Sequence, residues 1–283
     1  MRVLVTGARG LLAGAIIREF GAGHDVVALN REQLDITDDR AVAEVVAAER
    51  PELVVNCAVH NGVDAAEEDP APALEVNAFG VLALARAATA AGATLVHFSS
   101  DFVFDGETDR PYSEEDRANP RGAYGASKLL GDWFALECPR AYVLRVESLF
   151  GPAAAAGRRG SLATIVDRIR SRDEVPVFID RVASPSWTPE VARAARTLVE
   201  REAPRGLYHC VNSGHATWAE IAERAAQLLA LPLRKRELTL ETAGLRARRP
   251  RYCALSNAKL AAAGVTMRPW EDALVEFLAL PPA

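Results

Sequence analysis

The first 150 residues alternate short, apolar, β-rich runs with helical stretches. We predict strands at 2–7, 24–30, 52–58, 93–100 and 141–146, and helices at 11–20, 38–49, 70–91 and 120–137. Such alternation is typical of a parallel sheet with helices on both faces. The strands are almost continuously apolar, which indicates burial on both sides. The chain is therefore predicted to have an α/β fold, a Rossmann-type doubly wound parallel sheet.

The alternation loosens after Phe150. The predicted elements of the second half are helices at 161–172, 188–201, 216–229 and 269–278, a strand at 206–212, a loop at 151–160 and an arginine-rich stretch at 233–253. No repeat or low-complexity linker separates the halves. We predict an NADP-binding Rossmann domain over 1–150, with a return contribution from about 183–213. Residues 151–283 are then expected to form mainly a smaller substrate-binding α/β part.

Composition and charge narrow the class of protein. The 283 residues are 49% hydrophobic and 25% charged, which is ordinary for a soluble globular enzyme. The net charge of −5 argues against binding to nucleic acid or to a membrane surface. Strand-like sequence from Arg2 onward leaves no room for a signal peptide, and charges such as Arg86 interrupt the apolar stretches.

The four cysteines are scattered and show no metal-ligand spacing. Unpaired, scattered cysteines suit reduced thiols in a cytosol. We therefore expect a cytoplasmic protein without a metal site. The sequence leaves the oligomeric state open, with a homodimer among the options.

A glycine-containing turn joins the first strand to the first helix. Its sequence, GARGLLAG, places Gly7, Gly10 and Ala13 in a G-x-x-G-x-x-[G/A] pattern. The first glycine permits a tight turn, the second lets a diphosphate approach the backbone, and the alanine allows close packing. The helix N-terminus offers free N–H groups and a positive dipole end. At this junction the pattern predicts a dinucleotide site; a plain βα turn is the alternative.

The end of the second strand bears on cofactor choice. NAD-preferring folds usually carry an acid there, which binds the ribose hydroxyls, whereas this chain has Asn30 followed by Arg31. A guanidinium can clamp a 2′-phosphate that no carboxylate repels. We predict NADPH, with NADH as the second choice; the alternative is that Arg31 is a solvated surface residue. Asp35 and Ile36 are expected beside the adenine, unless Asp35 is only a helix-start acid.

A hydroxyl, a phenol and an ammonium are predicted to meet at one edge of the sheet. Ser100 ends the fourth strand, and the next helix carries Tyr124 and Lys128 four residues apart. Ligands of such folds bind at the carboxyl ends of the strands. An ammonium beside a phenol lowers the phenol's pKa, which suits proton donation to a carbonyl oxygen, and a serine can orient that oxygen. The alternative is an ordinary i,i+4 pair on a helix with Asn119 as N-cap and Pro120 as first residue.

These motifs resemble the extended short-chain dehydrogenase/reductases, and more narrowly the dTDP-4-dehydrorhamnose reductase (RmlD-like) family. The resemblance covers nearly the whole chain, through GARGLLA, LDITD, PELVVNCAVHNGVDAAE, EVNAFG, HFSSDFVFDG, YGASK, GLYHCVNSGHATWAEIA and RPRYCALSNAKL. It implies cofactor contacts at Gly7, Gly10, Leu11, Leu12, Asn30, Asp35, Ile36, Cys57, Ala58, Val59, Phe98, Tyr124 and Lys128. It also places His60 at the cofactor edge, Ser100 and Asp101 beside the substrate carbonyl, and Val63 and Asp64 near the sugar.

The chain departs from the family pattern on the substrate side. The family usually reads Arg-Thr-Ser-Trp after the fifth strand, where this chain has Arg145, Val146, Glu147 and Ser148, and Ala65 replaces a lysine of VDKAE. The flat tryptophan wall is thereby lost. We expect Glu147 and Ser148 to contact an altered substrate; the alternative is that Glu147 is a buried acid paired with Arg145 or another arginine.

The arginine-rich stretch bears on the rest of the substrate. Extended members of the superfamily bind nucleotide sugars, and a diphosphate suits bidentate guanidinium partners. Arg249 and Arg251 are the candidates; a solvated charge run is the alternative.

The resemblance implies NADPH-dependent reduction of the C4 ketone of a nucleotide-linked 4-keto-6-deoxysugar. In this hypothesis Tyr124 protonates the alkoxide, Lys128 tunes Tyr124 and holds the ribose, and Ser100 polarises the carbonyl. Two other functions stay open. One is a non-catalytic dinucleotide-binding subunit, like the regulatory subunit of methionine adenosyltransferase, and the other is a ketoreductase with a different substrate.

Overall fold

A six-stranded parallel sheet forms the centre of the protein, as the sequence predicts. The computed structural model describes residues 1–153 and 160–281, so most of the predicted loop at 151–160 lies outside the described residues. The strand order is β10-β5-β4-β3-β1-β2. These strands are β1 (Arg2–Thr6), β2 (Asp25–Leu29), β3 (Leu53–Asn56), β4 (Thr94–Ser100), β5 (Ala141–Val146) and β10 (Gly206–His209).

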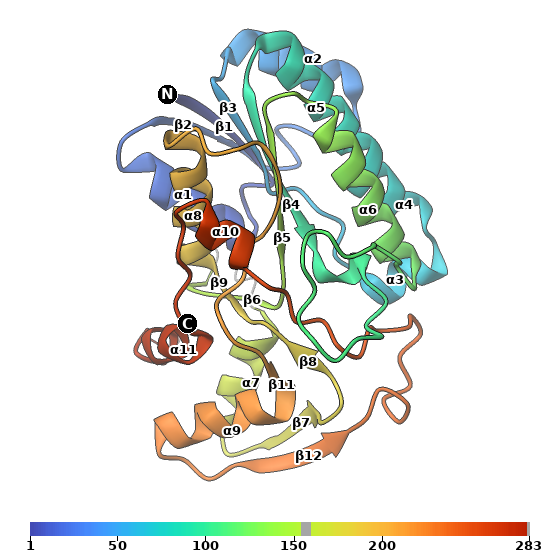
Figure 1. Ribbon diagram of the computed structural model, residues 1–283, viewed down its shortest axis with the longest axis vertical. Helices are drawn as coiled ribbons and strands as arrows, with labels where there is room; N and C mark the ends of the chain where they lie inside the picture. Colours follow the sequence, from blue (N-terminus) through green and yellow to red (C-terminus); the bar gives the residue numbers. More distant parts are fainter. Residues whose placement is uncertain (154–159, 282–283) are drawn as a thin grey trace.

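Helices cover both faces of this sheet (Figure 1). They are α1 (Leu11–Gly21) and α8 (Thr188–Glu200) on one face, and α2 (Asp39–Glu49), α5 (Gly80–Ala91) and α6 (Ala123–Leu136) on the other. Because side chains alternate along a strand, Val3 and Val5 pack toward α1 and α8, whereas Leu4 packs toward α2 and α5. This alternation of fully buried residues explains why the strand sequences are apolar throughout.

A second hydrophobic core lies below the carboxyl edge of the sheet (Figure 1). It gathers residues of α7 (Ser161–Arg170), α9 (Trp218–Leu229), α11 (Trp270–Leu278) and β7 (Glu174–Phe178). The smaller elements of the chain are α3 (Val63–Glu68), α4 (Ala71–Leu74), η1 (Glu75–Phe79), η2 (Asp101–Val103), α10 (Ala258–Ala262), β6 (Leu149–Phe150), β8 (Val182–Ala183), β9 (Ser186–Trp187), β11 (Ala216–Thr217) and β12 (Arg234–Leu238).

The chain crosses between the two cores more than once. After β9, α8 packs against α1, and β10 joins the sheet beside β5 in parallel. Trp187, at the end of β9, is fully buried between Phe150 and Phe277, with ring centroids 5.2 and 5.9 Å away. The two parts are thus tied by shared packing.

One predicted helix boundary is wrong, and one predicted helix is irregular inside its predicted bounds. The α6 helix begins at Ala123 with Gly122 as its N-cap, because the Asn119 side chain donates to Asp105 at 2.9 Å instead of capping a helix. The stretch predicted as one helix over 70–91 begins as α4, passes through a π-helical turn (η1) and continues as α5. This continuous helix, Ala71–Ala91, is long and apolar enough to span a membrane by length and composition alone. However, 56% of its most apolar part is buried within the protein, as in a core helix.

The arginine-rich stretch also differs from expectation at its start. Residues Arg234–Leu238 form β12, which pairs in parallel with β7. Four consecutive charged residues, Arg234–Glu237, concealed this strand in the sequence, because all four are exposed and the strand has no apolar face.

Sheet order determines where a ligand can bind. The chain runs from β1 outward to β2 and then returns to β3 on the other side of β1. At such a reversal the loops after neighbouring strands separate and leave a crevice beyond the carboxyl ends. The predicted phosphate turn follows β1 at this point.

Candidate active site

The turn after β1 has the geometry that a phosphate loop needs. Gly7 has a φ of +67°, and a Cβ there would lie 2.6 Å from the backbone nitrogen of Ala58. Only glycine can therefore occupy this position. Gly10 caps α1 without any side-chain hydrogen bond, so the first N–H groups of α1 face the cleft without a side-chain partner. These features fit a dinucleotide diphosphate.

The side chains after β2 are tied to each other. The Arg31 guanidinium contacts Asp35 at 3.1 Å, and the Asn30 carboxamide accepts from the Glu32 backbone at 2.8 Å. The Arg9 guanidinium, from the phosphate loop, binds Glu32 through two contacts of 2.8 and 3.0 Å. Arg31 and Arg9 therefore flank the position expected for the adenosine ribose, and Arg9 is a second cation that the sequence reasoning missed.

A cleft of about 570 Å³ opens beside the phosphate loop. Fifteen of the residues predicted for the site line it: Gly10, Leu11, Leu12, Cys57, Ala58, Val59, Val63, Phe98, Ser100, Asp101, Tyr124, Lys128, Glu147, Ser148 and Arg249. The predicted residues outside its lining are Gly7, Asn30, Arg31, Asp35, Ile36, His60, Asp64 and Arg251. The cleft therefore unites the predicted catalytic and substrate residues, whereas the predicted adenine contacts lie beyond it.

Two predicted contacts have other neighbours. Ile36 is buried in the core against Gly80, where an added Cβ would lie 2.8 Å from its Cδ1. Asp64 binds Arg249 at 2.8 Å and accepts from the Ala247 backbone at 2.9 Å. Asp64 thus anchors the arginine-rich segment over the cleft and does not itself line it.

The predicted hydroxyl, phenol and ammonium face the same cleft. Tyr124 lies in the first turn of α6, which can approach the sheet because Gly125 has no side chain: a Cβ there would be 2.3 Å from the Phe102 carbonyl oxygen. The Tyr124 ring packs edge-on against Phe102 with centroids 5.4 Å apart. One helical turn later, the buried Lys128 ammonium donates to the Phe98 carbonyl at 2.7 Å.

Burial dominates the electrostatics of this group. Burial raises the pKa of Tyr124 above its usual value and Asp101 adds to this rise, while hydrogen bonding by Ser100 acts in the opposite direction. Burial lowers the pKa of Lys128 from 10.5 to about 8, with Asp132 opposing the change. We predicted that Lys128 lowers the pKa of Tyr124, but the groups that act on this pKa are Asp101 and Ser100. The Lys128 ammonium is directed to a backbone carbonyl instead.

A buried ion pair supports this group from beneath. The Arg145 guanidinium donates to Asp132 at 3.0 Å, and both side chains are almost completely buried. Arg145 also lies over the Phe104 ring, 5.0 Å from its centroid. Because Arg145 is engaged by Asp132, it is not the partner of Glu147 that the sequence suggested.

A second buried cluster borders the cleft beside Tyr124. Ser100 donates to Asp101 at 2.8 Å, and Glu147 accepts from the Ser184 backbone at 2.6 Å. The Arg181 guanidinium lies 3.9 Å from Asp101. Arg181 was missed by the sequence reasoning, although a single arginine between the apolar runs VPVFI and VAS is an available signal for a buried cation.

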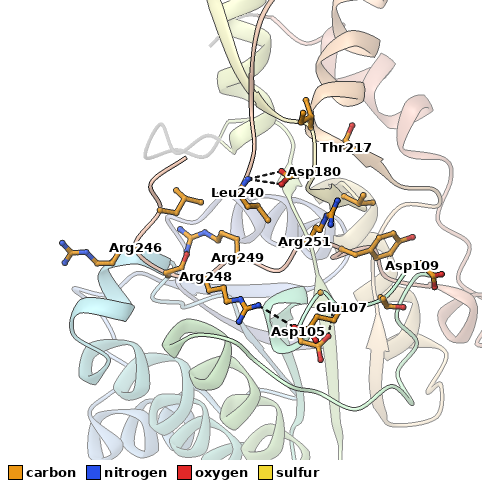
Figure 2. A pocket seen from close by; sticks show the side chains of 17 residues that line it. Asp105, Glu107, Asp109, Asp180, Thr217, Leu240, Arg246, Arg248, Arg249 and Arg251 are labelled. Carbon is orange, nitrogen blue, oxygen red and sulfur yellow. Dashed lines mark hydrogen bonds and ion pairs between the residues drawn. The ribbon is translucent and has the colours of Figure 1, made fainter. Parts of the chain in front are cut away.

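A larger groove of about 1260 Å³ continues from the cleft and shares Leu245 and Arg249 with it. Arg246, Arg248, Arg249 and Arg251 line this groove, and Figure 2 shows Asp180 and Thr217 on the rim opposite Arg248. Arg246 pairs with Glu68, Arg248 with Glu107 and Arg249 with Asp64. Among the described residues, no acidic side chain pairs with Arg251.

The parallel sheet, the phosphate turn at its reversal point and the Ser/Tyr/Lys group define a Rossmann-type protein of the short-chain dehydrogenase/reductase class. The family profile "RmlD substrate binding domain" matches residues 1–280. The chain therefore belongs to the RmlD family, which confirms the resemblance.

Characterised relatives agree with this assignment. The chain is 39% identical to a dTDP-4-dehydrorhamnose reductase of Streptomyces griseus, over 97% of this chain and 92% of that one. It is 35% identical to a dTDP-4-keto-6-deoxy-D-glucose reductase of Streptomyces niveus, over 99% and 97%. A crystal structure of the dTDP-4-dehydrorhamnose reductase of Bacillus anthracis in complex with NADP superposes with a TM-score of 0.92, at 29% identity and 98% coverage of both chains.

Proposed function

We propose that the protein is an NADPH-dependent reductase of the C4 ketone of a dTDP-linked 4-keto-6-deoxysugar. The observation that carries this proposal is the convergence of Ser100, Tyr124 and Lys128 on one cleft that continues from the phosphate loop into an arginine-lined groove. Relatives that cover nearly the whole chain are named as reductases of such sugars. The catalytic and binding roles of the predicted site residues are part of this proposal.

The cleft fits the cofactor, because Gly7 and the uncapped start of α1 leave space and N–H groups for its diphosphate. When bound, NADPH supplies the hydride that reduces the carbonyl carbon. Tyr124 gives its phenolic proton to the carbonyl oxygen as that oxygen gains charge, so the ketone becomes a secondary alcohol. Lys128, whose ammonium is held by the Phe98 carbonyl, would donate to the ribose of the bound cofactor.

Ser100 orients the carbonyl oxygen in this proposal. Its oxygen accepts from the Phe102 backbone N–H at 3.2 Å, and its hydroxyl is directed to Asp101. The hydroxyl carries one proton, so Ser100 would turn it from Asp101 to the carbonyl oxygen when the substrate binds. A hydrogen bond from this position stabilises charge that develops on that oxygen.

The arginine groove is proposed to bind the nucleotide diphosphate. Three of its four guanidiniums pair with carboxylates, whereas Arg251 has no acidic partner within the part of the chain that the structure describes. A guanidinium binds phosphate in a bidentate manner, which makes Arg251 the main contact.

The direct test is an NADPH oxidation assay of the purified protein with dTDP-4-keto-6-deoxyglucose and with dTDP-4-dehydrorhamnose. Turnover with either sugar supports the proposal. Tight NADPH binding with no turnover of either would favour the non-catalytic regulatory subunit. The Ser/Tyr/Lys group argues against that alternative, because mere cofactor binding has no need of an acid at the carbonyl position.

A further inference from the structure

The cluster of Asp101, Glu147 and Arg181 has one positive charge for two carboxyl groups. Both carboxyl side chains are almost fully buried, at 3% and 2% exposure. Arg181, in the loop after β7, is the cation between them, and it also lies over the Phe102 ring, 5.3 Å from its centroid. If both acids were ionised, the buried cluster would have a net negative charge. An uncompensated buried charge is strongly unfavourable.

Two oxygens in this cluster have no hydrogen-bond partner. They are Asp101 Oδ2 and Glu147 Oε1. The other oxygen of each acid is occupied, because Asp101 Oδ1 accepts from Ser100 and Glu147 Oε2 accepts from the Ser184 backbone. Potential ligand atoms of the two carboxyls and of Cys253 lie within 4.8 Å of one another. Asp101 Oδ2 faces the Arg181 guanidinium at 3.9 Å, and a single proton on this pair of acids would cancel the excess negative charge.

We infer that Asp101 and Glu147 share one proton, and that Glu147 thereby acts as a positioning residue that limits negative charge beside Tyr124. Its effect on the reaction rests on the proposed ketoreductase function; the shared proton itself does not. When the pair loses this proton, a second negative charge lies next to the oxygen that must receive charge from the hydride. That charge opposes the reaction.

The surrounding groups support the shared proton. The charged and titratable side chains that act on this pair are Arg181, Cys253, Tyr252 and Tyr124. Arg181 is the cation among them, and Arg249 acts on Arg181 in turn. Burial raises the pKa of Glu147 well above its usual range, and Asp101 raises it further. Burial likewise raises the pKa of Asp101, against the effect of Arg181.

The sign of the pH effect follows from these directions. An acid whose pKa is higher in the folded than in the unfolded chain binds more protons when folded, so stability falls as pH rises above the unfolded value. For Glu147 this fall in stability begins at about pH 4.3, the pKa of a glutamate in an unfolded chain. Replacing Glu147 with glutamine removes the titration and keeps the size and a donor group for Asp101. Relative to the parent, E147Q should therefore become more stable as pH rises.

The first experiment measures thermal unfolding of the parent protein and of E147Q between about pH 5 and about pH 7, below the titration of Lys128, whose pKa is about 8. The Tm of E147Q minus that of the parent should increase by roughly 2–4 °C per pH unit within this window. E137Q, which changes an exposed glutamate at the end of α6, is the matched control and should give a constant difference. A constant difference for E147Q as well would overturn the inference.

The second experiment uses D101N, which removes the other acid of the pair. If E147Q does not fold, D101N should show the same pH-dependent gain in Tm, and a flat difference there would count against proton sharing. For the reaction, the ratio of kcat/KM for E147Q to that of the parent should rise by up to about tenfold per pH unit above the pKa of the pair. Absence of turnover in every variant would contradict the proposed function, while the Tm result would still decide the shared proton.

Discussion

The two sides of the cleft are held in place by different kinds of interaction. On the cofactor side, backbone geometry fixes the functional groups: Gly7 fits against Ala58, and Lys128 is bound by the Phe98 carbonyl. On the substrate side, charged side chains hold one another, as Arg249 does with Asp64 across more than 180 positions of sequence. The comparison teaches that the proposed catalytic and cofactor groups are fixed by local backbone and packing, whereas the proposed substrate-binding residues are fixed by ion pairs between distant segments.

The largest effect is expected on the cofactor side, from Tyr124→Phe. Loss of the phenolic proton should lower kcat about 10³-fold, since a positioned general acid contributes between about 10² and 10⁴. NADPH affinity, measured by fluorescence titration, should change less than about threefold, because the phenol acts on the carbonyl oxygen. A turnover number equal to that of the parent would show that Tyr124 is not the proton donor.

Beneath the site, Arg145→Met should destabilise the fold by about 3–5 kcal/mol. The substitution leaves Asp132 as a buried carboxylate without its cation, which is the costly way to break a buried pair. Urea unfolding measures this loss. Arg140→Met, at an exposed position just before β5, is the control and should change the free energy of unfolding by less than about 0.5 kcal/mol. Equal losses in both variants would mean that the ion pair contributes nothing specific.

On the substrate side, Arg251→Ala should raise the KM for the dTDP-sugar about tenfold or more, with a smaller change in kcat. A charge-assisted hydrogen bond contributes about 1.5–3 kcal/mol, and about 1.4 kcal/mol corresponds to a factor of ten. Arg236→Ala, on the outer strand β12, is the control, because Arg236 pairs with Glu174 away from the groove. An unchanged KM for Arg251→Ala would assign the diphosphate to other groups.

The smallest effect is expected from Arg31→Ala. The Kd for NADPH should rise about fivefold to tenfold while that for NADH changes less than about twofold, because only NADPH carries the 2′-phosphate. The exposed Arg40, paired with Glu44 on α2, provides the control substitution. Arg9 binds Glu32, the residue after Arg31, and could also contact the 2′-phosphate. The double variant R9A/R31A should therefore lose more of the preference for NADPH over NADH than the single variant does. An equal loss of affinity for NADPH and NADH would argue for a structural role of Arg31.

The fold class and the grouping of the Ser, Tyr and Lys side chains could be predicted because each rests on local sequence signals. Apolar strands, a glycine at a strand-to-helix junction and the Tyr-x-x-x-Lys spacing are visible within short windows, and the structure brings Ser100, Tyr124 and Lys128 to one cleft. The helix start at Ala123 was not predicted, because Asn119 finds a distant acceptor in Asp105 that competes with capping.

The sequence by itself determined the parallel sheet, the phosphate turn and the order of the reactive side chains along the chain. Those features depend on residue spacing and backbone conformation, which neighbouring residues dictate. Only the tertiary structure decided that Glu147 lies near Asp101 and Arg181 instead of Arg145, and that Arg251 has no acidic partner among residues 1–153 and 160–281. Charge balance depends on which distant segments come into contact, and a local stretch of sequence does not indicate which segments these are.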